Sequence, residues 1–295
     1  MTREPHSYFA LPFHPKSFAL ISPLSAEDVK RAVLFIHGFN GSARGTWTDF
    51  LSLVDHQGAG DWWKDSDLFF LNYQWESVFS QLINNTLTVY KFLRAVFPAP
   101  HRALGTDNPF RTPDFNYRDL LLVGHSEGGL LLRKAMVEAA QHDPVVQPLL
   151  RSAQAANFSK PAPSGILAAR MRLFAPALGG EMLTGLIGII ATLPVISNFL
   201  VSSAAKVGMS PASAAVTEAR RQTVRYAEIT GYECFSAHIL WAEKDRIIHA
   251  EKYEHDLQCI NFPPGTNHVS VCKPTLKYPL PLDFVEAGVE HNACR

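Results

Sequence analysis

Short apolar runs alternate with longer segments of helical periodicity along most of the chain. The runs expected to be strands are residues 18–21, 32–36, 68–71, 120–123, 172–175, 237–241 and 257–262. Helices are expected over residues 80–97, which end at Pro98, and over residues 127–141, with Pro144 just beyond. Continuous apolar runs of this length are typical of parallel strands that are buried on both faces. The pattern therefore predicts a single α/β domain over residues 1–295, with a mostly parallel central sheet and helices on both faces.

One segment, residues 181–217, interrupts this alternation and is the most apolar part of the chain. It is about long enough to span a bilayer, but Pro194 splits it and polar residues such as Thr184 and Asn198 dilute it. Buried core helices and a transmembrane helix are two possible interpretations. We favour a third, a helical cap that is inserted after a strand and lays its apolar face over a binding cleft.

The balance of positive and negative residues bears on which kinds of partner the protein could bind. The chain has 295 residues, of which 47% are hydrophobic, and its 27 Lys and Arg residues equal its 27 Asp and Glu residues. A net charge of zero lacks the electrostatic footprint of a nucleic-acid-binding protein, so no nucleic-acid partner is expected. The N-terminal residues lack the apolar run of a secretory signal, and we expect a cytoplasmic protein.

The cysteines do not have the spacing of a metal site. All four lie in the last quarter of the chain, at Cys234, Cys259, Cys272 and Cys294, and no two form a C-x-x-C pair. Four cysteines in a chain of this length do not make a disulfide scaffold either. We therefore expect free thiols in a reducing compartment, and no metal.

The strongest chemical signal is the run Gly124-His125-Ser126-Glu127-Gly128, which matches the nucleophile motif G-x-S-x-G. A predicted strand precedes it and a predicted helix follows it, as the motif requires. The serine of such a motif occupies a strained turn, and small residues on both sides leave room for that turn. The following helix directs the positive end of its dipole at the site, where it would stabilise a developing oxyanion. Ser126 is therefore the predicted nucleophile.

An acid and a base are needed to activate this serine. Asp245 directly follows the predicted strand 237–241, with Glu243 as its rival, and would hold an imidazole in one tautomer. His268 lies in a turn-rich loop after the last predicted strand and is the favoured base. The other histidines of this region, His249, His255 and His291, lie too close to Asp245, before the last strand or near the C-terminus.

These runs resemble the α/β-hydrolase superfamily over about residues 30–275. Within it, the chain is similar to lipase-like serine esterases related to the GPI inositol-deacylases. The resemblance is carried by residues 35–39 (Phe-Ile-His-Gly-Phe), Trp47, residues 67–73, residues 123–130 and residues 268–274. The order Ser126, Asp245, His268 is the one expected of that superfamily. Relatives often carry Thr-Pro-His-x-Gly where this chain has Ala-Pro-Ala-Leu-Gly at 175–179, which leaves the substrate open.

The resemblance also implies an oxyanion hole. The loop after strand 32–36 would supply one donor, the backbone N–H of Phe39, because Gly38 lets the backbone approach the substrate. The other donor would be the N–H of Glu127, the residue after the nucleophile. The alternative for residues 37–39 is a tight turn that uses glycine for its dihedral angles only. The Glu127 side chain either complements the helix dipole or places a negative charge beside the hole that disfavours anionic substrates.

These features predict a serine hydrolase that cleaves a carboxylic ester with an apolar acyl group and needs no cofactor. The residues expected to contact a small-molecule or lipid-like ester are His37, Leu178, Leu183, Leu186 and Ile187. A thioesterase or an amidase would use the same triad. An alternative of another class is a membrane-associated binding protein on a hydrolase scaffold, with the apolar segment as its docking surface. Peripheral membrane contact through the cap is compatible with either class.

Overall fold

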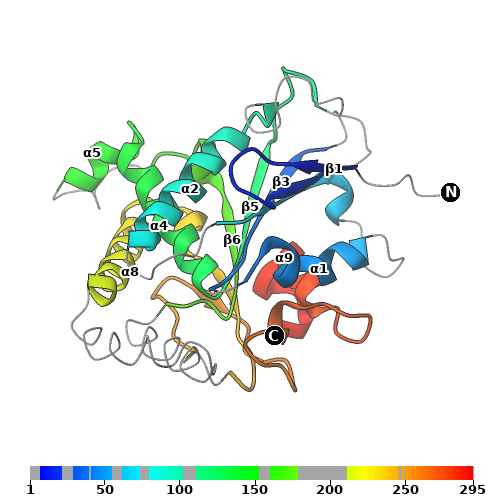
Figure 1. Cartoon of the computed structure of the whole chain (residues 1–295). Coiled ribbons are helices and arrows are strands. Elements are labelled where there is room, and N and C mark those ends of the chain that lie inside the picture. Colours follow the sequence, from blue (N-terminus) through cyan, green and yellow to red (C-terminus); the bar gives the residue numbers. More distant parts are fainter. Residues whose placement is uncertain are drawn as a thin grey trace.

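A computed structural model describes most of the chain (Figure 1). The described residues are 7–21, 29–39, 41–54, 62–73, 80–101, 111–152, 160–178, 211–245, 248 and 250–294. The predicted cap at 181–217 lies outside them up to residue 210, and so do the candidate substrate contacts Leu183, Leu186 and Ile187.

Eight strands form one sheet in the order β1-β2-β4-β3-β5-β6-β7-β8. They are β1 (Ser7–Ala10), β2 (Phe18–Ile21), β3 (Arg31–Ile36), β4 (Ser66–Leu71), β5 (Asp119–His125), β6 (Arg170–Phe174), β7 (His238–Leu240) and β8 (Leu257–Gln258). The pairings β1–β2 and β2–β4 are antiparallel, and all the others are parallel. The mostly parallel sheet predicted from the apolar runs is therefore confirmed. β1 was not predicted from the sequence, because it is short and pairs on one side only.

The register of the central strands brings their carboxyl ends to one edge of the sheet. Ile36 at the end of β3 pairs with Leu71 of β4 on one side and with Gly124 of β5 on the other. His125 at the end of β5 pairs with Phe174 at the end of β6. The loops that follow these four strands consequently start next to one another, which is where α/β proteins usually bind ligands.

Helices cover both faces of the sheet, as predicted (Figure 1). The helices α2 (Ser80–Val96), α4 (Glu127–His142) and α8 (Pro211–Thr230) lie on one face, and α1 (Ala43–Val54) and α9 (Leu280–Ala287) lie on the other. The remaining helix is α5 (Val146–Arg151), and the 3₁₀ turns are η1 (Trp62–Asp65), η3 (Gly165–Ala168), η4 (Glu233–Phe235), η5 (Ser270–Cys272), η6 (Gly288–Glu290) and η7 (Asn292–Cys294). Within the described part of the chain, no helix is both long enough and apolar enough to cross a bilayer.

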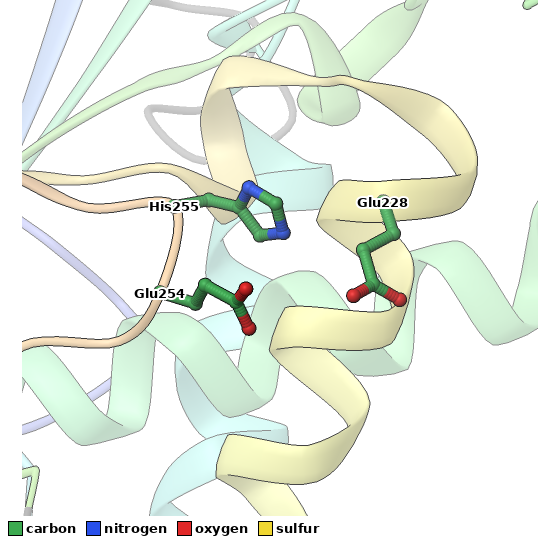
Figure 2. A group of neighbouring side chains, drawn as sticks. All are labelled: Glu228, Glu254 and His255. Carbon is green, nitrogen blue, oxygen red and sulfur yellow. The ribbon is translucent and has the colours of Figure 1, made fainter.

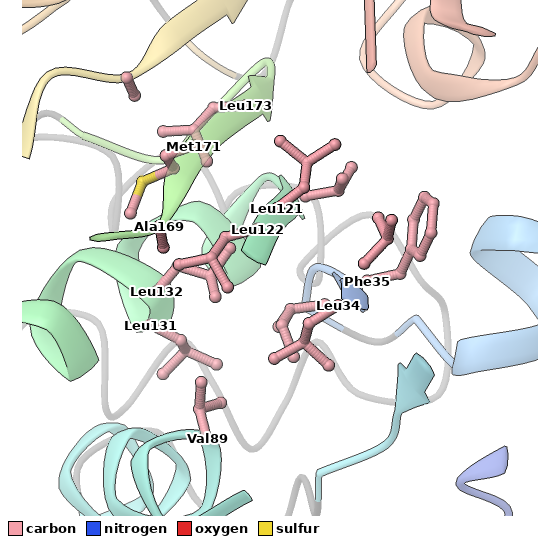
Figure 3. Close-up of a cluster of buried hydrophobic side chains, with 14 of the residues drawn as sticks. Leu34, Phe35, Val89, Leu121, Leu122, Leu131, Leu132, Ala169, Met171 and Leu173 are labelled. Atoms are coloured by element: carbon pink, nitrogen blue, oxygen red, sulfur yellow. The ribbon is translucent and has the colours of Figure 1, made fainter. Parts of the chain in front are cut away.

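The main core lies between the sheet and α2 and α4 (Figure 3). Leucines from the middle of β3 and β5 meet leucines of α4 and a valine of α2 there. The side chains are Leu34, Leu122, Leu131, Leu132 and Val89, and each is at most 1% exposed. Burying a side chain of this size is worth about 1.5–3 kcal/mol, so this layer fixes the position of α4 on the sheet. Trp47 of α1, one of the residues that carry the resemblance, is fully buried against Phe35 on the other face.

The last strand differs from its prediction. Residues 257–262 were expected to form a buried strand, but β8 has only two residues. Leu257 is 50% exposed and Ile260 is 78% exposed. β8 is the edge strand of the sheet and pairs with β7 only, and Ile260 lies beyond its end.

The cysteine prediction is wrong for two of the four residues. Cys259 and Cys294 form a disulfide, whereas Cys234 and Cys272 are free and buried. The pairing joins residues 35 positions apart, which spacing alone does not show to be neighbours. They meet because the C-terminal turn η7 runs beside β8, where the Ile260 N–H donates to the Cys294 carbonyl at 3.0 Å.

Candidate active site

Ser126 lies at the junction of β5 and α4 in the strained conformation that its motif predicts. Its backbone has φ 53° and ψ −123°, a region that residues with a side chain rarely adopt. Backbone hydrogen bonds hold this conformation, since the Ser126 N–H donates to Phe174 O and the Ser126 carbonyl accepts from the N–H groups of Gly129 and Ala177. Such strain persists only where the surrounding structure enforces it, and it is concentrated at functional sites.

The first turn of α4 packs tightly against the end of β3. A Cβ atom at Gly128 would lie 2.5 Å from the carbonyl oxygens of both Ile36 and His37, closer than any side chain tolerates. The same holds for Gly38, where a Cβ would lie 2.7 Å from the Cβ of Ser126. Both glycines are therefore needed for close approach of the backbone, which places the loop after β3 directly beside Ser126.

The structure brings the three residues of the predicted triad together. Ser126 Oγ lies 3.0 Å from His268 Nε2, and His268 Nδ1 lies 2.8 Å from Asp245 Oδ2. The other Asp245 oxygen accepts a hydrogen bond from the Ile248 N–H at 3.0 Å. The side chains of His268 and Asp245 are only 8% and 6% exposed, so water competes little for these contacts. This geometry lets His268 accept a proton from Ser126 while Asp245 fixes its tautomer.

The rival acid and bases occupy other places. Glu243 is exposed and accepts a hydrogen bond from the Gly265 N–H at 2.6 Å, so it braces the loop that carries His268. Near the C-terminus, His291 Nε2 lies 3.4 Å from Asp283 Oδ2. His249 lies outside the described residues.

A second buried histidine, His125, forms a hydrogen bond to the backbone of His268. The His125 Nε2–H donates to the His268 carbonyl at 2.7 Å, and the two rings lie 4.9 Å apart. Burial, and next the neighbouring His268, lowers the pKa of His125 to about 3, so its ring stays neutral and acts as a fixed donor. This role was not predicted from the sequence, because spacing does not show where the side chain of a variable motif position points.

The proposed oxyanion donors lie on two segments that border Ser126. Phe39, which is half-buried, follows Gly38 in a turn closed by a hydrogen bond from the Gly41 N–H to the Gly38 carbonyl. Glu127 is the first residue of α4, where backbone N–H groups have no acceptor within the helix. Their use as oxyanion donors stays a prediction.

A buried network links these two segments. Tyr73 Oη lies 2.8 Å from the His37 carbonyl oxygen and 3.3 Å from Glu127 Oε2. The His37 ring stacks on the Tyr73 ring at 4.2 Å, and its Nδ1–H donates to the Gly38 carbonyl at 2.8 Å. His37 is only 3% exposed, so its ring stabilises the loop, and its predicted contact with substrate stays untested. Tyr73 was not singled out from the sequence, although it ends one of the runs that carry the resemblance.

Burial shifts the pKa values of Glu127, His37 and Tyr73, the three side chains of this network. It raises the pKa of Glu127 to about 7, an effect that the hydrogen bond to Tyr73 partly offsets. It lowers the pKa of His37 to about 4 and, together with Glu127, raises that of Tyr73 well above its ordinary value. Neither a permanent charge beside the hole nor a simple helix-dipole carboxylate describes Glu127, because it holds a proton up to about neutral pH.

Leu178 lies on the segment after β6. The Ala177 N–H donates to the Ser126 carbonyl, and the next residue, Leu178, is 1% exposed. The segment departs in sequence from that of the resembled family. Contact of Leu178 with a substrate stays a prediction.

One group of side chains has the composition of a metal site. The ligand atoms of Glu228 on α8 and of Glu254 and His255 before β8 lie within 4.8 Å of one another (Figure 2). Both glutamates are exposed and His255 is half-buried, and exposed acidic groups commonly lie this close without an ion. None of the three belongs to the cluster around Ser126, and we assign no ion to them.

Comparison with known proteins places the architecture. No protein-family model and no curated protein matches the sequence. Among solved structures, the peroxisomal α/β-hydrolase Lpx1 of Saccharomyces cerevisiae superposes with a TM-score of 0.50 at 10% identity, covering 97% of this chain and 90% of that one. This chain has the α/β-hydrolase fold.

Two further structures with this likeness are esterases or hydrolases by name. Carboxyl esterase 2 from Tuber melanosporum has a TM-score of 0.49 at 12% identity, over 97% of this chain and 85% of that one. The siderophore hydrolase EstB from Aspergillus fumigatus has a TM-score of 0.47 at 14% identity, over 96% and 95%. At these identities the likeness concerns the fold alone, and the kinship to GPI inositol-deacylases stays a prediction.

Proposed function

We propose that this protein is a serine hydrolase that cleaves carboxylic esters with an apolar acyl group. The observation that carries the proposal is the hydrogen-bonded series from Ser126 Oγ through the His268 ring to Asp245 Oδ2, with separations of 3.0 and 2.8 Å. It lies at the carboxyl edge of the sheet, on a strained turn of the kind that is concentrated at functional sites. A nucleophile, a base and an orienting acid in this arrangement are what acyl transfer requires.

The reaction would proceed in two halves. In the first, His268 accepts the proton of Ser126 while Oγ attacks the ester carbonyl carbon, and the N–H groups of Phe39 and Glu127 stabilise the oxyanion. The tetrahedral intermediate collapses, the imidazolium of His268 gives its proton to the departing alcohol, and Ser126 remains acylated. In the second half, His268 takes a proton from the water that attacks the acyl-enzyme. His268 then returns this proton to Ser126 Oγ as the acid is released.

The predicted apolar acyl group has two sources of support. Leu178 continues directly from the Ala177 amide that donates to the Ser126 carbonyl, and residues 181–201 belong to the most apolar segment of the sequence. A cap formed by that segment would bury the acyl chain and could place the protein at a lipid surface.

The length of the acyl chain should govern the rate. For p-nitrophenyl esters from acetate upward, we expect kcat/KM to rise by up to about fourfold per methylene, because each buried methylene contributes about 0.8 kcal/mol, and then to level off when the cleft is full. The Ser126→Ala variant measures the uncatalysed background. A kcat/KM that decreases steadily from acetate onward would contradict the apolar acyl site.

A further inference from the structure

The network of Tyr73, Glu127 and His37 has no part in the proton transfers of the triad, yet it joins the two segments that hold the oxyanion donors. We call residues 37–39 the oxyanion loop. We propose that Tyr73 and Glu127 are positioning residues that hold this loop through the His37 carbonyl, and that a proton on Glu127 switches their hold on and off. The inference rests on the proposed function, because it concerns the site where the oxyanion would form.

The Tyr73 hydroxyl cannot donate a full hydrogen bond to both of the oxygens that lie beside it. It has one proton to donate, but two oxygens lie within hydrogen-bond distance of Oη. The shorter contact, 2.8 Å, is to the His37 carbonyl, which can only accept. The 3.3 Å contact to Glu127 Oε2 can then be a hydrogen bond only if the acid is protonated and donates to Tyr73 Oη. The resulting series runs from Glu127 through Tyr73 to His37 O.

When Glu127 loses its proton, the hydrogen bond between Glu127 and Tyr73 changes direction. An ionised Glu127 can only accept, and a charged acceptor competes strongly for the single Tyr73 proton. The hydroxyl then turns toward the carboxylate, and the His37 carbonyl loses its donor while it remains buried. A buried carbonyl without a donor is unfavourable by about 1–3 kcal/mol, so the peptide that leads into Gly38 and Phe39 is less firmly held.

The surroundings of Glu127 set the pH at which this happens. Among the described residues, the titratable side chains around this network are Tyr73 after β4, His37 after β3, His125 at the end of β5, His268, Asp245, and His14, which interacts electrostatically with His37. Burial lowers the pKa values of His37 and His125 to about 4 and 3, so neither supplies a positive charge at neutral pH. Burial also raises the pKa of Glu127 to about 7, so the acid is neutral below that pH and ionised above it.

Ionisation opposes catalysis in a second way. Glu127 supplies one of the proposed oxyanion donors with its own backbone, so its carboxylate would place a like charge beside the developing oxyanion. The weaker hold on the oxyanion loop and the like charge beside the oxyanion both lower the expected activity. The hydrolase should be more active with neutral Glu127 than with ionised Glu127.

The kinetic test compares wild-type protein with Glu127→Gln over pH 5.5–9. The side-chain amide introduced by this substitution donates to Tyr73 as the neutral acid does, and it cannot ionise. The ratio of the two kcat/KM values cancels every pH effect that the two proteins share. We expect the ratio of the kcat/KM of Glu127→Gln to that of wild-type protein to be about 3- to 10-fold higher at pH 8.5 than at pH 6. A ratio that does not change with pH overturns the inference.

Two further variants separate positioning from general damage. Tyr73→Phe should lower kcat by about tenfold with little change in KM, because the oxyanion loop acts in the transition state. Glu138→Gln makes the same substitution further along α4, where the side chain pairs with His142, and should show a pH-independent ratio near one. A Tyr73→Phe variant with wild-type kcat would overturn the inference.

A readout without turnover keeps this inference distinct from the proposed function. Infrared difference spectra between pH 6 and pH 8.5 should show the loss of a carboxylic acid C=O band, which is missing in Glu127→Gln and present in Glu138→Gln. Absence of that band in wild-type protein overturns the proton on Glu127 whether or not the protein hydrolyses esters. Absence of hydrolysis at every pH, with the band present, rejects the proposed function instead.

Discussion

Ser126→Ala is expected to lower kcat for ester hydrolysis by about 10⁴-fold or more, to near the background rate. Each half of the proposed reaction forms or breaks a bond at Ser126 Oγ, and no hydroxyl remains at that position in the variant. Because a triad acts as a unit, His268→Ala should cost about as much, and the combined variant should lose little beyond either one. Steady-state rates on a p-nitrophenyl ester measure all three.

A matched control shows that the loss is local. Ser52 is an exposed serine of α1 whose hydroxyl donates to its own helix at Asp49 O, and Ser52→Ala should keep wild-type rates. Removal of the Ser126 hydroxyl leaves the fold intact, so circular dichroism and the unfolding midpoint of the active-site variant should match those of wild-type protein. A Ser126→Ala variant that retains more than a tenth of the wild-type kcat would contradict the assignment of the nucleophile.

Asp256→Ala is expected to lower the free energy of unfolding by about 3–5 kcal/mol. Asp256 and Arg133 form an ion pair at 2.6 Å in which both side chains are 0% exposed. The carboxylate also accepts from the N–H groups of Ala237 and Tyr253, at 2.9 and 2.8 Å. The substitution would leave a buried guanidinium and two buried amides without their acceptor. Since a domain is stable by about 5–15 kcal/mol in all, this loss is a large fraction of the total.

The Arg133–Asp256 pair connects the helix that follows Ser126 to the segment before β8. Arg133 lies on α4, which begins at the strained serine turn, and Asp256 lies in the segment that connects β7 with β8. Urea unfolding of Asp256→Ala, followed by tryptophan fluorescence, measures the change. The control is Glu218→Ala, which breaks the exposed pair with Arg221 on α8 and should change stability by less than about 1 kcal/mol. Equal effects of the two variants would refute the structural role of the buried pair.

Much of the fold could be predicted from the sequence, because buried parallel strands are continuous apolar runs. The strands at 32–36, 68–71 and 120–123 were found within two residues of their ends, and helix 80–97 within one. The failures occurred where that signal is weak. β1 and β8 lie at the edges of the sheet, where pairing on one side tolerates short and mixed runs. The disulfide joins residues 35 positions apart, and that pairing depends on the tertiary path of the C-terminus.

The candidate site was predicted in part for a similar reason. Ser126, Asp245 and His268 occupy positions that follow predicted strands, and the parallel sheet gathers such positions at one edge. The choice of Asp245 over Glu243 depended on which of two neighbouring loop residues faces His268. Tyr73 and His125 could not be assigned, since their roles depend on side-chain direction within a packed core and no motif encodes it.

The most direct test of the central claim is to incubate the wild-type protein with a fluorophosphonate probe and to locate the adduct by mass spectrometry. The probe reacts with a serine that a neighbouring base has activated, and it needs no knowledge of the natural ester. We predict one adduct, on Ser126, that is absent in Ser126→Ala and strongly reduced in His268→Ala. A folded wild-type protein that remains unlabelled, or that is labelled equally at other serines, would contradict the proposed serine hydrolase.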